Sequence, residues 1–173
     1  MQNEENLKYP IGKFAEPAFY TKSNLLGWIN DLRDFPKLLD LAVSNLSKAQ
    51  LNQNYRPEGW SARQVIHHLA DSHMIGLLRF KWALSERNSI IKAFPEETWA
   101  TFADYKLPIE IPLKMIYAVH AQWVGLLESF TENEWKRTYT NSESGSTNSL
   151  EKAVAVYAHH GLHHLAQINL LKK

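Results

Sequence analysis

Apolar residues recur at helical spacing in four separate stretches of this 173-residue chain. In each stretch an apolar position returns every three or four residues, which is typical of an amphipathic helix with one face toward a core. The predicted long helices span residues 23–46, 61–86, 111–130 and 149–171. Four such helices in one chain predict a mainly α protein, organised as a four-helix bundle.

Residues near the predicted helix ends support these boundaries. Ser61 is a suitable N-cap for the second helix, and Pro112 suits the first turn of the third. Asn148, with Glu151 three residues later, predicts the start of the last helix. Pro36 lies inside the first helix, where we expect a kink or a break just before it.

Shorter elements are expected before and between the long helices. Residues 1–20 contain prolines and a glycine, and we expect them to run extended over the surface. The segment 87–99 is predicted to be a loop in which Pro95 opens a short helical turn. A capping box at 131–134 predicts another short turn, and 137–149 fits a small exposed β-hairpin or a loop.

The composition is that of one soluble globular domain covering residues 1–173. Hydrophobic residues make up 45% and charged residues 21% of the chain. A net charge of +1 gives no basic surface for nucleic acid or an anionic membrane. The first residues lack an apolar signal core, and no apolar run approaches the ~20 residues of a membrane span. We therefore expect a cytoplasmic protein.

Histidine is the candidate functional residue type in this chain. The chain has no cysteine, so a metal would need His, Asp or Glu ligands. The stretch 156–168, VYAHHGLHHLAQI, holds four of the eight histidines. On a helical wheel His160 and His164 border the core face, whereas His159 and His163 point outward. The first pair has the i, i+4 spacing by which one helix presents two imidazoles to one metal ion.

An HxxxH pair is a weak motif until another element supplies a third ligand. A single histidine at the edge of a helix more often forms a hydrogen bond with a neighbouring residue. The second helix offers three candidates, His67, His68 and His73. His73 lies in the middle of the apolar stripe, which favours a buried structural role. His67 points away from the stripe, and spacing alone favours His68 over it only slightly.

Two further residues are candidate assistants to catalysis. Asp71 lies one turn beyond His68 and could orient an imidazole or bind water. His120 stands alone on the third helix, where packing beside Trp123 is the simpler interpretation and a role in lining the site is the alternative.

Three segments in this order resemble one known family. They are YPIGKF near the start, GWSARQVIHHLADSHMIGLLRFKWALSE in the second helix and YAHHGLHHLAQI in the last. The chain resembles the YfiT-type branch of the DinB superfamily over nearly its whole length. This resemblance implies a DinB-like bundle, commonly a homodimer, with zinc or nickel held by three histidines. The matching ligands are His68 in HHLAD, with His67 as a neighbouring alternative, and then His160 and His164.

One departure from the family pattern concerns the third helix. Relatives often have His-x-Arg-Trp there, whereas this chain has His120, Ala121, Gln122 and Trp123. If that arginine holds an anionic substrate in relatives, the hold is missing or altered here.

We expect the first of three functions, and the resemblance implies the first two. The first is a metal-dependent hydrolase, in which the open metal position holds a water whose pKa falls toward ~7 and which attacks a small-molecule substrate. The second is an S-transferase that activates a low-molecular-weight thiol at the same position. The third is a metal-stabilised dimer that binds small molecules without catalysis. No protein cysteine is needed for any of them.

Overall fold

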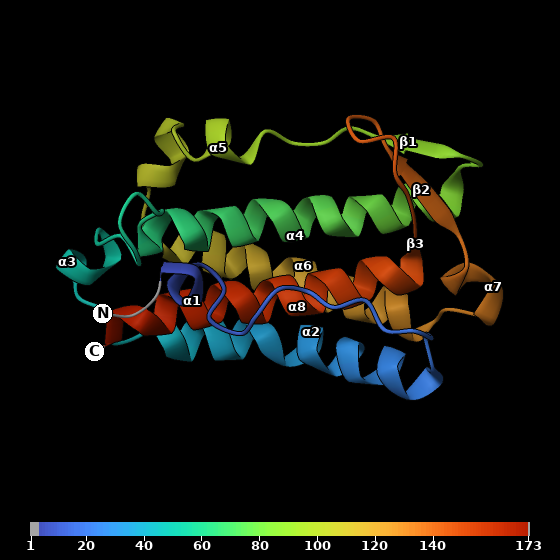
Figure 1. Ribbon diagram of the computed structural model, residues 1–173, viewed down its shortest axis with the longest axis horizontal. Coiled ribbons are helices and arrows are strands. Elements are labelled where there is room, and N and C mark those ends of the chain that lie inside the picture. The colour runs from blue at the N-terminus through green and yellow to red at the C-terminus, as the bar shows by residue number, and fades with distance from the viewer. Residues whose placement is uncertain (1–3, 173) are drawn as a thin grey trace.

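A computed structural model describes residues 4–172, and four long helices dominate it (Figure 1). They are α2 (Lys22–Val43), α4 (Ala62–Ser85), α6 (Glu110–Glu128) and α8 (Leu150–Asn169). The helices lie side by side as a bundle, and the prediction of a mainly α four-helix bundle is confirmed.

The order of packing around the bundle differs from the order along the chain. Helix α2 packs against α6 and α8, and α4 packs against the same two helices. The consecutive long helices α2 and α4 are therefore diagonal partners, as are α6 and α8. In this arrangement α8 packs against α4. These two helices carry most of the histidines.

Side-chain caps fix the helix ends. The Ser61 side chain accepts a hydrogen bond from the backbone N–H of Gln64, so the predicted cap of α4 is confirmed. The predicted cap of the last helix is wrong by one residue: Ser149, not Asn148, accepts from the N–H of Lys152. The capping box at 131–134 is also present and starts α7 (Glu132–Trp135).

We expected a kink or a break at Pro36; helix α2 continues through this residue, so there is no break. The helix ends at Val43, three residues before its predicted end, because Ser47 caps a separate short helix, α3 (Lys48–Leu51). Helix α8 ends at Asn169 and continues as a 3₁₀ turn, Leu170–Lys172.

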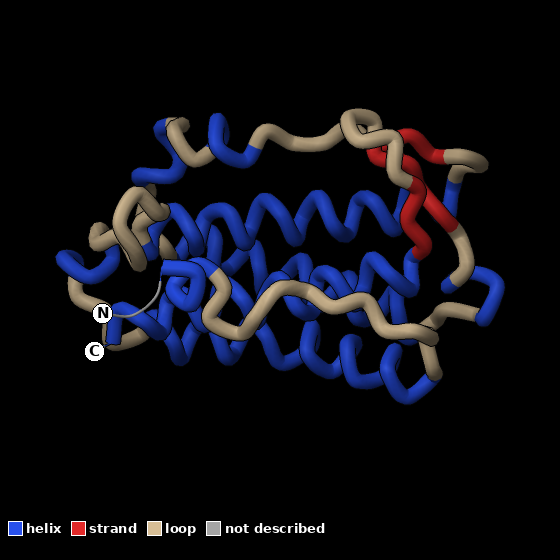
Figure 2. Tube along the Cα trace, in the orientation of Figure 1, coloured by secondary structure: helices blue, strands red, loops and turns tan. Residues whose placement is uncertain are grey.

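The N-terminal segment is partly helical. The expectation that 1–20 is extended is wrong for α1 (Glu4–Lys8), and residues 1–3 lie outside the described part. From 9 to 21 the chain is largely irregular and runs lengthwise over the bundle, beside α8 (Figure 2). This segment covers the outer face of α8 near its histidines: Phe14 packs on His159 and Tyr9 on His163.

A three-stranded sheet closes one end of the bundle. The predicted hairpin is present as β2 (Thr138–Asn141) and β3 (Thr147–Ser149), which pair antiparallel. The predicted loop 87–99 contains an unexpected strand, β1 (Ser89–Ile91), which pairs parallel with β2. Sequence could not indicate it, because three residues carry no measurable periodicity. The chain then forms α5 (Glu96–Trp99), directly after Pro95 as predicted, and a 3₁₀ turn, Ala103–Lys106.

The core has two apolar clusters along the bundle axis. The cluster near the sheet includes Trp123, Phe80 and Leu150, and the one at the opposite end includes Leu39, Ile66 and Ile168. On α6, Tyr117 lies outside both clusters and is 45% exposed. In the described residues, no helix has both the length and the apolar character needed to cross a membrane.

Candidate metal centre

Three histidines from two helices converge between α4 and α8. His68, His160 and His164 each offer a ring nitrogen, and these three nitrogens lie within 4.8 Å of one another. The Nε2 atoms of His68 and His160 are 3.2 Å apart. Two nitrogens bound at about 2.0–2.1 Å to one tetrahedral zinc ion lie about 3.3 Å from each other. The three side chains therefore fit a single divalent ion in both ligand type and spacing.

His160 is connected to two buried histidines behind it. Its Nδ1 lies 3.1 Å from Nε2 of His73, and Nδ1 of His73 lies 2.8 Å from Nε2 of His120. Nδ1 of His120 is 2.6 Å from the carbonyl oxygen of Leu32. The prediction that His73 is buried and hydrogen-bonded is confirmed, but its partners are other imidazoles, which the apolar pattern could not indicate.

His164 is oriented by a residue that the sequence reasoning missed. The Nδ1–H of His164 donates to Oε1 of Gln167 over 2.8 Å. The amide nitrogen of Gln167 donates in turn to the carbonyl oxygen of Lys8 in α1. Since a carbonyl only accepts, this bond fixes which way the amide points. Nε2 of His164 is left for a ligand. The position of Gln167, three residues after a candidate ligand, would have suggested this contact.

Burial keeps these imidazoles neutral, the form in which they bind metal. Burial lowers the pKa of His68 to about 4. For His160 and His164, burial is again the largest cause, and neighbouring histidines lower the pKa further, well below 6.5. Holding three neutral imidazoles side by side costs the folded chain stability. Clusters of ionisable groups with shifted pKa values are common at functional sites.

Two other candidates on α4, His67 and Asp71, have their hydrogen-bond partners away from the triad. His67 is buried, stacks on Tyr105 and donates through Nε2 to the carbonyl oxygen of Leu107. Asp71 accepts a hydrogen bond from the Tyr105 hydroxyl over 2.8 Å. No hydrogen bond joins Asp71 to His68 among the described residues, and Nδ1 of His68 is buried without a partner. His67 and Asp71 therefore bind the segment around the 3₁₀ turn Ala103–Lys106, through Tyr105 and Leu107.

His159 and His163 lie on the outer side of α8, as predicted, but the N-terminal segment half-buries them. His163 accepts a hydrogen bond from the Gln167 amide over 2.9 Å, so it supports the residue that orients His164. The ring of His159 packs on Phe14 and stacks on His163. Apart from being adjacent to His160 in the chain, it has no ring contact with the triad among the described residues.

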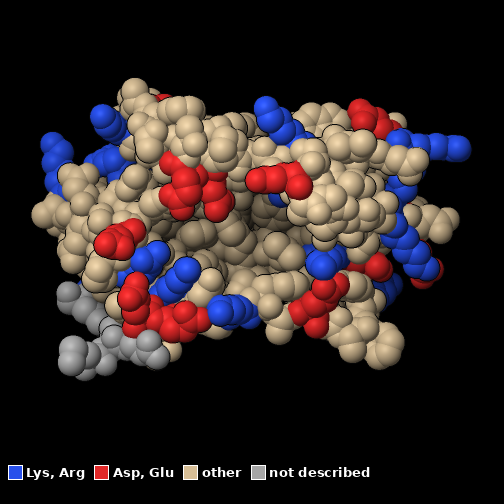
Figure 3. Space-filling model, turned by 45° about the horizontal axis from the view of Figure 1, so that its top comes forward, with Lys and Arg blue, Asp and Glu red and all other residues tan. Residues whose placement is uncertain are grey.

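Two clefts meet at the triad. The smaller, of about 350 Å³, is lined by all three histidines together with Trp60. The larger, of about 580 Å³, extends from His160 toward the sheet. Figure 3 shows this face hollowed between a rim of acidic side chains and a rim that carries both charges. A small molecule can therefore enter the clefts that the three histidines line.

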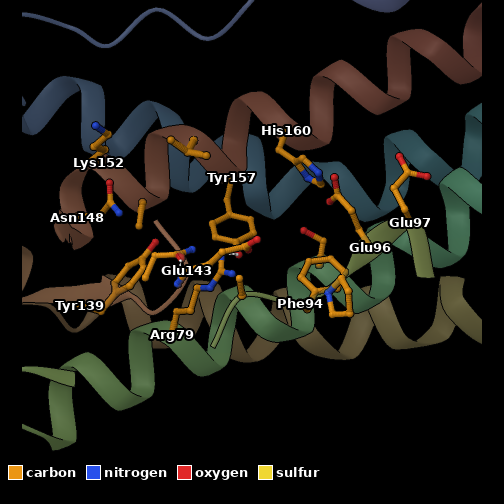
Figure 4. Close-up of a pocket in the computed structure, with 16 residues that line it drawn as sticks. Arg79, Phe94, Glu96, Glu97, Tyr139, Glu143, Asn148, Lys152, Tyr157 and His160 are labelled. Atoms are coloured by element: carbon orange, nitrogen blue, oxygen red, sulfur yellow. Dashed lines mark hydrogen bonds between the residues drawn. The ribbon is translucent and has the colours of Figure 1, made fainter. Parts of the chain in front are cut away.

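Glu96 is a candidate acid or base that the sequence reasoning also missed. It lines both clefts, and its side chain extends toward the His160 ring (Figure 4). Burial raises the pKa of Glu96, with a smaller contribution from the adjacent Glu97. Glu97 accepts a hydrogen bond from the indole of Trp60. Glu96 lies in a short helix of a segment predicted to be a loop, where sequence gives no indication of distance to a histidine.

Arg79 provides a cation in the larger cleft. Its guanidinium donates to the Tyr157 hydroxyl over 2.8 Å and lies over the Tyr139 ring (Figure 4). Its Nε is buried without a hydrogen-bond partner, and no carboxylate in the described residues forms an ion pair with it. Gln122, where relatives often have arginine, is instead exposed on α6 and lines neither cleft.

Comparisons with known proteins found relatives of this chain. Residues 31–168 match the model of the DinB superfamily. A protein of Oceanobacillus iheyensis named "putative metal-dependent hydrolase" is 46% identical over 168 residues, which is 97% of each chain.

Two solved structures share the fold. The first is YfiT from Bacillus subtilis, described as "a probable metal-dependent hydrolase with an unusual four-helix bundle topology". It superposes with a TM-score of 0.93 at 35% identity, over 96% of each chain. The mycothiol-dependent maleylpyruvate isomerase has a TM-score of 0.65 at 14% identity, over 83% of this chain and 60% of the isomerase, and shares the fold alone. On the strength of the family match and these relatives, the chain belongs to the DinB superfamily.

Proposed function

We propose that the protein is a metal-dependent hydrolase whose divalent ion is held by His68, His160 and His164. The observation that carries the proposal is the convergence of three neutral imidazole nitrogens, within 4.8 Å of one another, in the wall of an open cleft. Three imidazoles leave one position of a tetrahedral ion free for a ligand from solvent. The names of the curated relatives and of YfiT point to the same class of reaction.

The metal is zinc or nickel in this proposal. Imidazole suits both ions, and a ligand set without oxygen atoms disfavours magnesium and calcium. When bound, such an ion supplies a Lewis acid that polarises a carbonyl and lowers the pKa of a coordinated water toward ~7. Gln167 holds the His164 ring in place, and the indole of Trp60 packs on the His68 ring, with ring centroids 4.7 Å apart.

Glu96 is the proposed acid–base residue. It extends toward His160 where the two clefts join, and its raised pKa lets the carboxyl exchange a proton closer to neutral pH. The carboxylate accepts a proton from the attacking water, and the resulting acid delivers it to the leaving group. The assistants expected from the sequence lie elsewhere: His120 is bonded to His73 behind the triad, and Asp71 is bonded to Tyr105.

The substrate is proposed to be a small molecule with one anionic group. Arg79 lines the larger cleft without an ion-pair partner among the described residues, and its guanidinium can bind a carboxylate or phosphate in the geometry that its fork favours. Lys152, the other cation of this cleft, already pairs with Glu16 over 2.7 Å. Glu143 lines the same cleft, which disfavours a polyanion such as nucleic acid.

Metal binding is tested first, by titrating the metal-free protein with zinc against a chromophoric chelator. We expect one zinc ion per chain, complete loss of that site in His160→Ala, and normal binding in His159→Ala. The control removes the adjacent histidine of the same helix, which packs on Phe14. Normal zinc binding by His160→Ala would refute the ligand assignment.

Turnover is tested next with pairs of esters and amides that differ only in one carboxylate. Zinc-dependent release of product without added thiol supports hydrolysis. Release that requires a low-molecular-weight thiol, with the thiol found in the product, would replace hydrolysis by the S-transferase reaction at the same site. Zinc binding without either reaction would favour the non-catalytic dimer, for which the oligomeric state is measured by light scattering.

A further inference from the structure

A row of hydrogen-bonded imidazoles joins the candidate metal centre to the backbone of α2. It runs from His160 through His73 and His120 to the carbonyl oxygen of Leu32, with successive distances of 3.1, 2.8 and 2.6 Å. Its members come from α8, α4, α6 and α2, so the row crosses the whole bundle. His73 and His120 line neither cleft beside the triad, and neither side chain can touch a substrate there.

Pro36 makes the end of this row available. In an α-helix the carbonyl of Leu32 would accept the N–H of residue 36, but proline has none. The freed oxygen accepts from His120 instead. The ring of Phe35 stacks on both His73 and His120, with centroids 5.3 and 5.2 Å apart, and holds the two imidazoles in line.

The carbonyl at the end sets the direction of every bond in the row. An oxygen of this kind only accepts, so His120 carries its proton on Nδ1 and presents a bare Nε2. His73 must then donate from Nδ1 to that nitrogen and accept at Nε2. The only group facing Nε2 of His73 in the row is Nδ1 of His160, which therefore carries a proton.

This order holds because the row is uncharged. His73 is fully buried, and its ring neighbours Phe35, Trp123 and Tyr157 include no carboxylate. A second proton on His73 would create an imidazolium without a counter-ion in an apolar interior. Each neutral ring has one proton, so the choice made at Leu32 is transmitted to His160.

We propose that His73 and His120 are positioning residues that hold His160 as its Nδ1–H tautomer, with a bare Nε2 toward the centre between His68 and His164. The tautomer itself stands apart from the proposed function, whereas its effect on metal binding rests on it. Hydrogen-bond partners of a metal-binding imidazole typically change metal affinity by about 10–100-fold.

Two substitutions at His120 separate this role from simple packing. His120→Phe keeps an aromatic ring but cannot accept from His73. His73 then moves its proton to Nε2 and donates to His160, whose own proton moves to the nitrogen that should bind metal. His120→Gln keeps the direction, because an amide can accept from His73 through its oxygen and donate to Leu32 through its nitrogen. His67→Phe is the matched control, since it removes another buried histidine bonded to a backbone carbonyl.

The first readout is the tautomer of His160 in the metal-free wild-type protein, from two-bond ¹H–¹⁵N correlation spectra with assignment by a His160→Gln variant. We expect the Nδ1–H form. A proton on Nε2 of His160 overturns the proposal whether or not the protein binds metal or hydrolyses anything, and this readout needs no other variant to fold.

The second readout is zinc affinity, measured by chelator competition. We expect His120→Phe to bind zinc about 10–100-fold more weakly than wild type, and His120→Gln and His67→Phe to remain within about threefold. Circular dichroism at each zinc concentration identifies a variant that is unfolded. A folded His120→Phe with wild-type affinity, or equal losses in the Phe and Gln variants, contradicts the proposal. Absence of zinc binding in wild type would refute the proposed function, and the tautomer would still decide this inference.

Discussion

The Nε2 atom of His68 lies 3.2 Å from the Nε2 atom of His160, although 92 positions separate the two residues in the chain. The contact depends on α4 and α8 being neighbours in the bundle, with His160 and His164 on the side of α8 that faces α4. Two ring nitrogens at this distance can share one hydrogen bond in the metal-free protein, and they are also spaced as two ligands of one metal ion.

Helix α4 depends on a glycine for its close packing. A Cβ at Gly76 would lie 2.4 Å from the Trp123 ring and 2.7 Å from the Tyr157 ring. Gly76→Ala should therefore destabilise the protein by about 1–3 kcal/mol, because the rings must move apart. Gly125→Ala is the control: it lies in α6 with open space around it and should stabilise the protein by about 0.5–1 kcal/mol. Urea denaturation measures both, and equal effects would contradict the packing described.

Acid should destabilise the metal-free protein. Burial lowers the pKa of His120 to about 4 from its ordinary 6.5. Below pH 6.5 His120 is protonated in the unfolded chain, whereas in the folded chain it stays neutral down to about pH 4. The free energy of unfolding therefore decreases as the pH falls from 6.5 to about 4. The expected loss for this residue is on the order of 1 kcal/mol per pH unit. Unfolding with urea from pH 7.5 to 4.5 measures it, and the slope should be shallower in His120→Gln. An unchanged slope in that variant would contradict the assignment.

Features that depend on residues close together in the chain could be predicted from the sequence. The helical periods predicted the four long helices, and the Ser61 cap and the orientation of the HxxxH pair followed from local spacing. Spacing favoured His68 over His67 only slightly, and the resemblance to a family favoured His68 further while His67 stayed the alternative. The structure brings His68, and not His67, to the other two histidines.

What the sequence could not predict depends on tertiary contacts. Glu96 reaches the triad through an irregular segment, and β1 exists only because β2 is beside it. The link from Pro36 to His120 joins two helices through one carbonyl oxygen, and no periodicity encodes it. Assembly as a homodimer, the identity of the metal and a cytoplasmic location stay predictions.

The carboxylate of Glu96 should be needed for turnover and not for metal binding. Glu96→Gln removes proton transfer while keeping the shape of the side chain, and should lower kcat by about 10²–10⁴-fold. Zinc affinity should stay within about threefold, since Glu96 is not among the three ligands. Glu97→Gln is the matched control, because Glu97 already accepts a bond from Trp60. Retained turnover in Glu96→Gln, or an equal loss in the control, would remove Glu96 from the mechanism.

The guanidinium of Arg79 should distinguish anionic from neutral substrates. Arg79→Met should raise KM for a carboxylate-bearing ester by about tenfold or more, through loss of a charge-assisted hydrogen bond. KM for the matched neutral ester should change little, which also controls for damage to the Tyr157 contact. Steady-state kinetics with the ester pair measures both values. Equal changes for the two esters would mean that Arg79 stabilises the cleft and does not recognise the substrate.

The position of a bound metal ion tests the central claim most directly. A crystal of the protein grown with zinc, measured on both sides of the zinc absorption edge, yields an anomalous difference map. The account predicts one strong peak about 2.0–2.1 Å from one ring nitrogen each of His68, His160 and His164. A crystal with zinc present and no peak among these three residues, or a peak bound by His67 or His163 instead, would contradict it.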